Sequence, residues 1–248
     1  MTTSIQPTRR TLVRSAAWTV PVIAVASTAP AFAASPCDTQ GYTLDWGNNA
    51  KTTYSAPNNP GGTGTKTSVA TVLPPTGSGA SALGVTFTST MFGSMSRAND
   101  NLLLSTETNV GGLGQGQGLN MSHAAAIPTG YANRQEVTVS FARAVTNLQF
   151  SITDVDAQQN GWIDQVAVTG TRTGVPAAGT VQGSGTNESP WMPVYYGNAG
   201  NNQGTGNVAL TFPSVAANTP FTIAFWNLGG NSNQRIFLGN MTFSAKGC

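Results

Sequence analysis

The chain has 248 residues, with 11 Lys and Arg against 9 Asp and Glu. Three of the basic residues lie within the first 14 positions, so the remainder carries eight basic and nine acidic side chains, a net charge near −1. A near-neutral chain without a basic cluster lacks the positive surface that binds phosphate backbones or anionic lipid. Nucleic acid and a polybasic membrane contact are therefore not expected.

The first 33 residues have the features of an export signal. The pair Arg9-Arg10 precedes a moderately apolar run, and a small-x-small cleavage site ends at Ala33. The twin arginines favour the twin-arginine route over the general secretory route. A buried amino-terminal helix is the alternative, but Pro21 and Pro30 would interrupt it. We predict that residues 1–33 are a signal peptide.

The remaining residues, 34–248, are predicted to form a single secreted domain with no membrane span. Its cysteines are Cys37, near the predicted mature start, and Cys248, the last residue. In an oxidising compartment these two positions can join the chain ends in a disulfide. Lipid modification of Cys37 is the competing interpretation, but the preceding residues lack the Leu-x-small pattern and place Pro36 directly before the sulfur.

From residue 41 onward, short segments with apolar residues at alternate positions are separated by Gly, Asn and Pro clusters. The predicted strands are 42–46, 67–73, 83–90, 101–105, 119–123, 135–142, 145–153, 162–168, 180–182, 191–195, 207–212, 221–226 and 235–244. Nowhere does a 12-residue window show helical spacing. A dozen or so short strands of this kind predict an all-β fold, a two-sheet antiparallel β-sandwich of jelly-roll type.

The central stretch, 135–170, holds the clearest strand pairing and a dense group of carboxylates. Asp154, Asp156 and Asp164 surround one predicted turn, where they would repel one another unless a cation or hydrogen-bond donors offset their charge. Carboxylate oxygens of this kind suit calcium. The alternative is that the aspartates bond to the backbone of the turn, with Asn160-Gly161 making the tight bend. Both interpretations stay open at this point.

Several aromatic residues lie where loops are expected. Trp162, Trp191, Tyr195 and Tyr196, together with Asn198, are candidates for ligand binding. Aromatic faces beside amide side chains make a platform on which sugar rings stack while the amides bond the hydroxyls. The alternative is that these rings fill the sandwich core or cap its ends.

This sequence offers few of the residue patterns that catalysis requires, and no catalytic residue is assigned. His123 is the single histidine, and it is interpreted as a strand-end residue and not as a zinc ligand or a catalytic base. Glu107, Glu136 and Glu188 are candidates for a paired-carboxylate hydrolase by residue type alone, with no motif that links any two of them. The chain is therefore expected not to be an enzyme.

Two parts of the chain resemble known families. The leader, with Arg9-Arg10-Thr11 and the Trp-x-x-Pro-Val run of residues 18–22, resembles those of actinobacterial exported proteins. Residues 145–156 and 236–243 resemble strands of bacterial cell-surface β-sandwich domains of the adhesin or lectin-like kind. The resemblance implies a secreted or cell-surface binding module for glycan or cell-envelope material, with no defined functional residue carried over. A structural envelope protein without a small ligand is the first alternative, and a glycoside hydrolase is the second.

Overall fold

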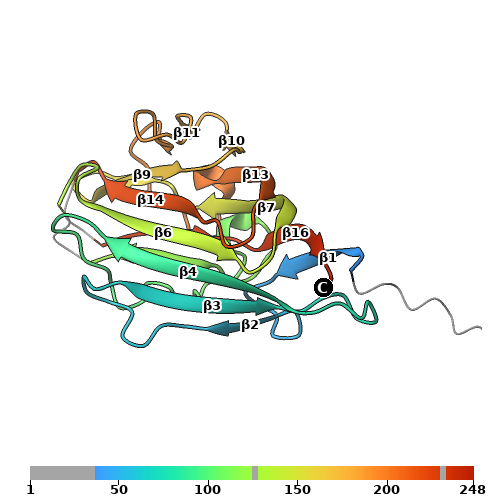
Figure 1. The fold of residues 1–248 in the computed structure, drawn as a ribbon. Helices are drawn as coiled ribbons and strands as arrows, with labels where there is room; N and C mark the ends of the chain where they lie inside the picture. Colours follow the sequence, from blue (N-terminus) through green and yellow to red (C-terminus); the bar gives the residue numbers. More distant parts are fainter. Residues whose placement is uncertain (1–36, 125–127, 230–232) are drawn as a thin grey trace, which may run out of the picture. The chain divides into compact units, whose positions relative to one another are not determined.

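A computed structural model describes residues 37–124, 128–229 and 233–248, so the predicted signal peptide lies outside the described residues. In this part of the chain, two seven-stranded antiparallel sheets pack face to face, and the second of them crosses the front of Figure 1. The described residues belong to one compact unit. Over the described ranges, no helix is long and apolar enough to cross a membrane.

The first sheet has the order β1-β16-β7-β13-β10, and β15 pairs with both β7 and β5. Its strands are β1 (Thr39–Leu44), β5 (Leu119–His123), β7 (Val145–Thr153), β10 (Thr173–Pro176), β13 (Val208–Val215), β15 (Gln234–Leu238) and β16 (Met241–Lys246).

The second sheet has the order β2-β3-β4-β6-β14-β9-β8. Its strands are β2 (Thr52–Ser55), β3 (Lys66–Val72), β4 (Leu83–Met91), β6 (Arg134–Phe141), β8 (Ala157–Gln158), β9 (Trp162–Val168) and β14 (Phe221–Asn227). A separate two-stranded ribbon joins β11 (Val181–Gln182) to β12 (Met192–Pro193), and two 3-10 turns, η1 (Val110–Gly112) and η2 (Gly204–Gly206), lie in loops.

The strand order is that of a jelly roll. The chain passes from one sheet to the other repeatedly: between β1 and β2, β4 and β5, β5 and β6, β6 and β7, β7 and β8, β9 and β10, β13 and β14, and β14 and β15. Trp191 exchanges two backbone hydrogen bonds with Val166 of β9 and so extends the second sheet beyond that strand. The predicted all-β jelly-roll sandwich is confirmed, with β2, β3 and β4 added at the opposite edge of the second sheet.

The core lies between the two sheets, and the alternation of apolar residues decides which side chains enter it. In β6, Val137, Val139 and Phe141 are fully buried, while the residues between them are half-buried. In β7, Leu148 and Ile152 are likewise fully buried. Because successive side chains of a strand point to opposite faces, a period of two places one set in the core.

Three of the predicted strands differ in the structure. Residues 101–105 form turns with an isolated bridge from Leu104 to Leu119, and not a strand. The predicted strand 191–195 shrinks to the two residues of β12, and 235–244 divides into β15 and β16. The division falls at Gly239 and Asn240, because the side chain and backbone of Asn240 bond to other segments there.

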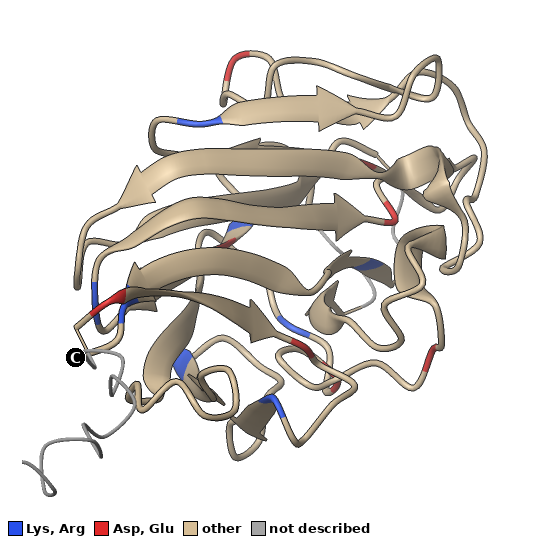
Figure 2. Ribbon diagram, turned by 90° about the vertical axis from the view of Figure 1, so that its right-hand side faces the viewer, with Lys and Arg blue, Asp and Glu red and all other residues tan. Residues whose placement is uncertain are grey.

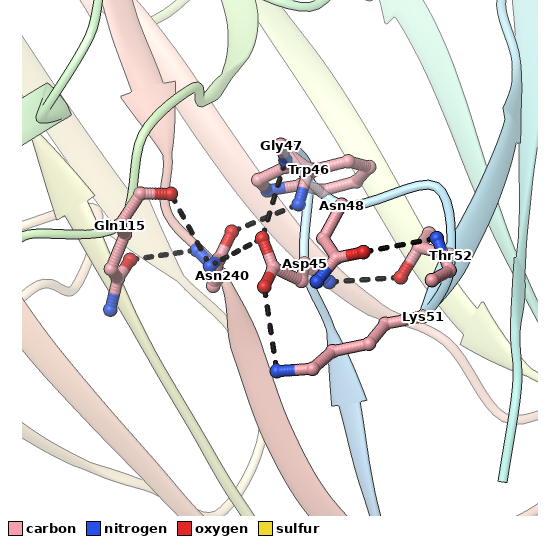
Figure 3. Close-up of polar contacts among 9 residues, drawn as sticks. Asp45, Trp46, Gly47, Asn48, Lys51, Thr52, Gln115 and Asn240 are labelled. Carbon is pink, nitrogen blue, oxygen red and sulfur yellow. Dashed lines mark hydrogen bonds and ion pairs between the residues drawn. The ribbon is translucent and has the colours of Figure 1, made fainter. Parts of the chain in front are cut away.

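Asn240 joins three segments that are far apart in the sequence (Figure 3). Its side-chain oxygen accepts a hydrogen bond from the backbone N–H of Trp46 at 3.0 Å, and its amide nitrogen donates to Asp45 at 3.1 Å. Its own backbone N–H donates to Gln115 Oε1 at 2.9 Å. Asp45 also lies 3.7 Å from the ammonium of Lys51. These bonds hold the end of β1 and the loop that carries Gln115 against the β15–β16 turn.

The two chain ends of the described unit are tied by a disulfide between Cys37 and Cys248, which confirms the predicted pairing. The bond lies beside an existing strand pair, because Thr39 of β1 is opposite Lys246 of β16. Charged residues are few in the described part of the molecule, and they are dispersed along its ribbon (Figure 2).

Candidate functional site

A cavity of about 300 Å³ opens where six segments of the sandwich meet. These segments are the loop at 98–100, the end of β5, the residues after β7, the start of β9, the loop after β12 and the start of β15. We call it the first cavity. Its polar and aromatic lining consists of Asp100, Ser122, His123, Asp154, Asp156, Trp162, Asn198, Asn201, Asn233, Gln234 and Arg235.

A second cavity of about 200 Å³ adjoins the first. Asp156 and Asn198 line both cavities, so these two residues form the boundary between them. The polar and aromatic lining of the second cavity also includes Thr180, Tyr195, Gln203 and Thr205. Each cavity thus contains one aromatic side chain, which is Trp162 in the first cavity and Tyr195 in the second.

The backbone at Asp154 turns sharply as the chain leaves β7. Asp154 has a φ of 68°, a left-handed conformation that Asp and Asn adopt more readily than most residues. The neighbouring chain must approach closely, since a Cβ at Gly206 would lie 2.7 Å from the backbone nitrogen of Val155. Glycine at position 206 permits this approach, and the Val155 N–H donates to the Gly206 carbonyl at 3.0 Å. The side chain of Asp154 is thereby placed in the cavity lining.

Asp156 connects the β8–β9 hairpin to the loop that follows β12. Its Oδ1 accepts a hydrogen bond from the indole N–H of Trp162 at 2.5 Å, and its Oδ2 accepts one from the backbone N–H of Ala199 at 2.7 Å. The carboxylate therefore orients the half-buried indole and fixes the loop that carries Asn198.

Asp164 lies beneath the first cavity and not in its lining. It is fully buried, and it accepts hydrogen bonds from the backbone N–H of Asp156 at 3.1 Å and from Gln234 Nε2 at 2.5 Å. Gln234 Oε1 lies 3.0 Å from His123 Nδ1, and the His123 ring stacks on Phe225 with centroids 4.3 Å apart. A polar chain therefore runs from the aspartates into the core through Gln234 to His123.

Burial changes the pKa of the three aspartates and of His123. It raises the pKa of Asp154 to about 8, with repulsion from Asp156 adding to the effect and attraction to Arg235 opposing it. Burial raises the pKa of Asp156 to about 6 against the two hydrogen bonds it accepts. The pKa of Asp164 is also raised, by burial and then by repulsion from Asp156. Burial lowers the pKa of His123 to about 4, so its imidazole is neutral at pH 7.

The structure brings together most of the residues predicted for ligand binding and for metal binding. Trp162, Asn198, Asp154 and Asp156 share the first cavity, although the sequence placed them in two separate hypotheses. Tyr195 lines the second cavity and is 58% exposed. Aromatic and acidic candidates therefore form one site.

Two of the predicted ligand-binding aromatics lie elsewhere. Trp191 is 0% exposed, its ring packs against Gly174 and Gly185, and the guanidinium of Arg172 lies 4.6 Å from the ring centroid. This corrects its assignment to a ligand surface, because a ring enclosed on all sides cannot stack on a sugar. Tyr196 is 62% exposed and lines neither of the two cavities.

The three glutamates considered for hydrolysis do not share the site. Asn201 donates a hydrogen bond to Glu107 Oε1 at 2.9 Å. Glu136 pairs with Arg134 at 2.7 Å. Glu136 and Glu188 line one further cavity of about 240 Å³, formed between the second sheet and the loop after β11. No pattern in the sequence predicts that these two glutamates line the same cavity.

Among the residues of the first cavity that sequence reasoning missed are Asp100, Ser122, Gln234 and Arg235. Gln234 lies opposite His123 in the β15–β5 register, a pairing across 111 positions that no local pattern signals. His123 is the last residue of β5, as predicted. Its side chain is buried, and its contact with Gln234 makes it part of the polar chain.

Known proteins match this chain in structure but not in sequence. No protein-family model matches it, and no curated protein matches it in sequence. Among solved structures, it is similar to the glucan binding protein C of Streptococcus mutans, with a TM-score of 0.39 and 12% identity. That protein is described as mediating both sucrose-independent and sucrose-dependent adherence. The similarity covers 78% of this chain and 61% of that one.

Proposed function

We propose that this chain is a secreted or cell-surface binding module for carbohydrate, and that its ligand occupies the two adjoining cavities. One observation carries the proposal: Asp156 and Asn198 join two cavities, each of which contains one accessible aromatic side chain. Sites of this size with an aromatic wall and a few convergent polar groups are typical of small-ligand binding.

The chemistry of the lining supports a polyhydroxylated ligand. The faces of Trp162 and Tyr195 offer apolar area to the C–H face of a sugar ring. Amides at Asn198, Asn201 and Gln203 carry both donors and acceptors, which matches hydroxyl groups that donate and accept in turn. Such a lining favours sugars over purely apolar ligands.

An extracellular location is part of the proposal. The disulfide between Cys37 and Cys248 is compatible with an oxidising compartment, since cytosolic thiols are kept reduced.

Tyr195, which lines the second cavity, and its neighbour Tyr196, which lines neither cavity, provide a matched test. Tyr195→Ala is expected to weaken binding about tenfold or more to a glycan first identified on an array of soluble glucan, chitin and peptidoglycan oligosaccharides, because truncating an aromatic anchor removes much of its contact energy. Tyr196→Ala, equally exposed but outside both cavities, is expected to bind with unchanged affinity. Titration calorimetry on both variants measures the difference.

Two results of this experiment would count against the proposal. Equal losses in both tyrosine variants would place the ligand outside the cavities. No binding to any glycan on the array would favour a structural protein of the envelope without a small ligand.

Calcium at Asp154, Asp156 and Asp164 is a separate prediction. Both oxygens of Asp156 and both of Asp164 accept hydrogen bonds. Over the described ranges, no group of three or more His, Cys, Asp or Glu is arranged to hold a metal ion. A bound calcium would therefore have to rearrange these contacts.

The calcium prediction expects a melting temperature that rises with calcium concentration, because an ion that binds the folded state alone stabilises it by mass action. Magnesium is expected to do less, and Asp156→Asn is expected to abolish the effect. Scanning calorimetry in excess calcium and in chelator measures it. Identical melting curves would mean that hydrogen-bond donors alone offset the carboxylate charge.

A further inference from the structure

The lining of the first cavity has an excess of acidic groups. Three aspartates, at positions 100, 154 and 156, face a single arginine, Arg235. His123 does not change this balance at pH 7, since burial keeps its imidazole neutral. The cavity therefore carries a formal charge of two negative units when all three carboxylates are ionised.

The three aspartates differ in how fully they are satisfied. Asp100 accepts a hydrogen bond from the Ser122 hydroxyl at 2.6 Å and lies 3.7 Å from the guanidinium of Arg235. Asp156 accepts two hydrogen bonds, from Trp162 and Ala199. Asp154, in contrast, has a carboxylate oxygen, Oδ1, that is buried and has no hydrogen-bond partner.

A buried, unpartnered carboxylate oxygen on a residue of the cavity lining is unfavourable for the free protein. Asp154 is 8% exposed, so little water reaches it, and a buried acceptor without a donor destabilises the folded protein, more so when the acceptor is charged. Arg235 cannot satisfy it fully, because its guanidinium pairs with Asp100 and also lies 4.8 Å from the centroid of the Phe237 ring. The site lacks one positively charged donor.

We infer that the first cavity selects glycans that carry a free amine, with the ligand ammonium donating to the carboxylate of Asp154. This inference rests on the proposed function and specifies its ligand. An ammonium supplies both the missing donor and the missing charge, and charge-assisted hydrogen bonds of this kind are stronger than those of a neutral hydroxyl. A ligand carboxylate or phosphate in the same position would face three aspartates and be repelled.

Three hexasaccharides with the same β-1,4 backbone test the inference, because they differ at carbon 2 alone. The glucosamine hexamer carries an amine there, the N-acetylglucosamine hexamer an amide, and cellohexaose a hydroxyl. Calorimetric titration of the secreted protein at about pH 7 is expected to show about tenfold tighter binding of the glucosamine hexamer than of cellohexaose. Burial raises the pKa of Asp154 to about 8, so the ligand ammonium displaces the proton that Asp154 holds in the free protein and pairs with the ionised carboxylate.

Two variants separate the role of Asp154 from general attraction to a polycation. Asp154→Asn keeps the shape of the side chain, and Asn tolerates the left-handed backbone at this position. This variant is expected to lose the tenfold preference, so that the glucosamine hexamer and cellohexaose bind it with similar affinity. Asp38→Asn removes an exposed carboxylate that lines none of these cavities, and it is expected to keep the preference.

The possible outcomes distinguish failure of the inference from failure of the proposed function. Binding of neutral glycans with no preference for the amine overturns the inference and leaves the proposed function standing. A preference that survives Asp154→Asn, or that Asp38→Asn also abolishes, overturns the assignment to Asp154. Binding to no glycan on the array overturns both.

Discussion

The free energy of unfolding is expected to fall as the pH rises from about 4 to about 8. The cause is the buried aspartates, because burial raises the pKa of Asp154 from 3.8 to about 8 and that of Asp156 to about 6. In this window the folded protein holds protons that the unfolded chain has released. Stability decreases with pH wherever the folded state binds more protons than the unfolded state.

His123 opposes this trend over part of the window. Burial lowers its pKa from 6.5 to about 4, so between these values the unfolded chain binds the proton and the folded protein does not. Each pKa unit corresponds to about 1.4 kcal/mol, and Asp154 and Asp156 together outweigh His123. The net loss of stability from pH 4 to pH 8 is on the order of 5 kcal/mol, before any contribution from Asp164.

Urea unfolding across this pH range measures the effect. Asp154→Asn is expected to be more stable than the wild type at about pH 8, because it removes a buried carboxylate that burial disfavours when charged. Its stability is also expected to depend less on pH above 6, where Asp154 titrates. Asp38→Asn, at an exposed position, serves as the control. A wild-type stability that rises steadily between pH 4 and pH 8 would contradict this account of the aspartates.

Removing the disulfide is the second change with a large expected effect. The bond joins residues 211 positions apart, and in the chain-entropy model closing a loop of this length stabilises the fold by about 5 kcal/mol. The double variant Cys37→Ser and Cys248→Ser is therefore expected to unfold at a much lower urea concentration than the oxidised protein. Reduction of the wild type should reproduce the loss.

Ligand affinity provides the internal control for the disulfide prediction. The bond ties β1 to β16, and no residue of these strands lines the first or second cavity. The serine variant is accordingly expected to bind glycan as the wild type does at temperatures where it remains folded. Free thiols on both cysteines in secreted protein, or an unchanged unfolding midpoint after reduction, would contradict the prediction.

Local features of the fold were predictable, because they depend on neighbours in the sequence. The alternation in residues 135–142 and 145–153 placed Val137, Val139, Leu148 and Ile152 on the core faces of β6 and β7. This works since a strand sends successive side chains to opposite faces whatever its partner is. The absence of helical spacing likewise indicated an all-β sandwich.

The role of individual aromatics was not predictable from local pattern. Trp191 and Tyr195 stand four positions apart in a segment with similar composition, yet Trp191 is enclosed in the core and Tyr195 is exposed beside a cavity. The difference arises because Trp191 pairs with Val166 at the sheet edge, where the small residues Gly174 and Gly185 leave room for its ring. That contact joins segments that the sequence does not mark as neighbours.

The sequence by itself determined the strand-rich sandwich, the pairing of Cys37 with Cys248, and the grouping of acidic residues after β7. Tertiary structure alone decided that Asp164 lies beneath the first cavity, that Gln234 connects it to His123, and that Asp154 lines the cavity with Trp162. The physical reason is that alternation and turn chemistry act over a few residues, whereas the cavity forms where β5, β9 and β15 meet through a register set by packing of the whole sandwich.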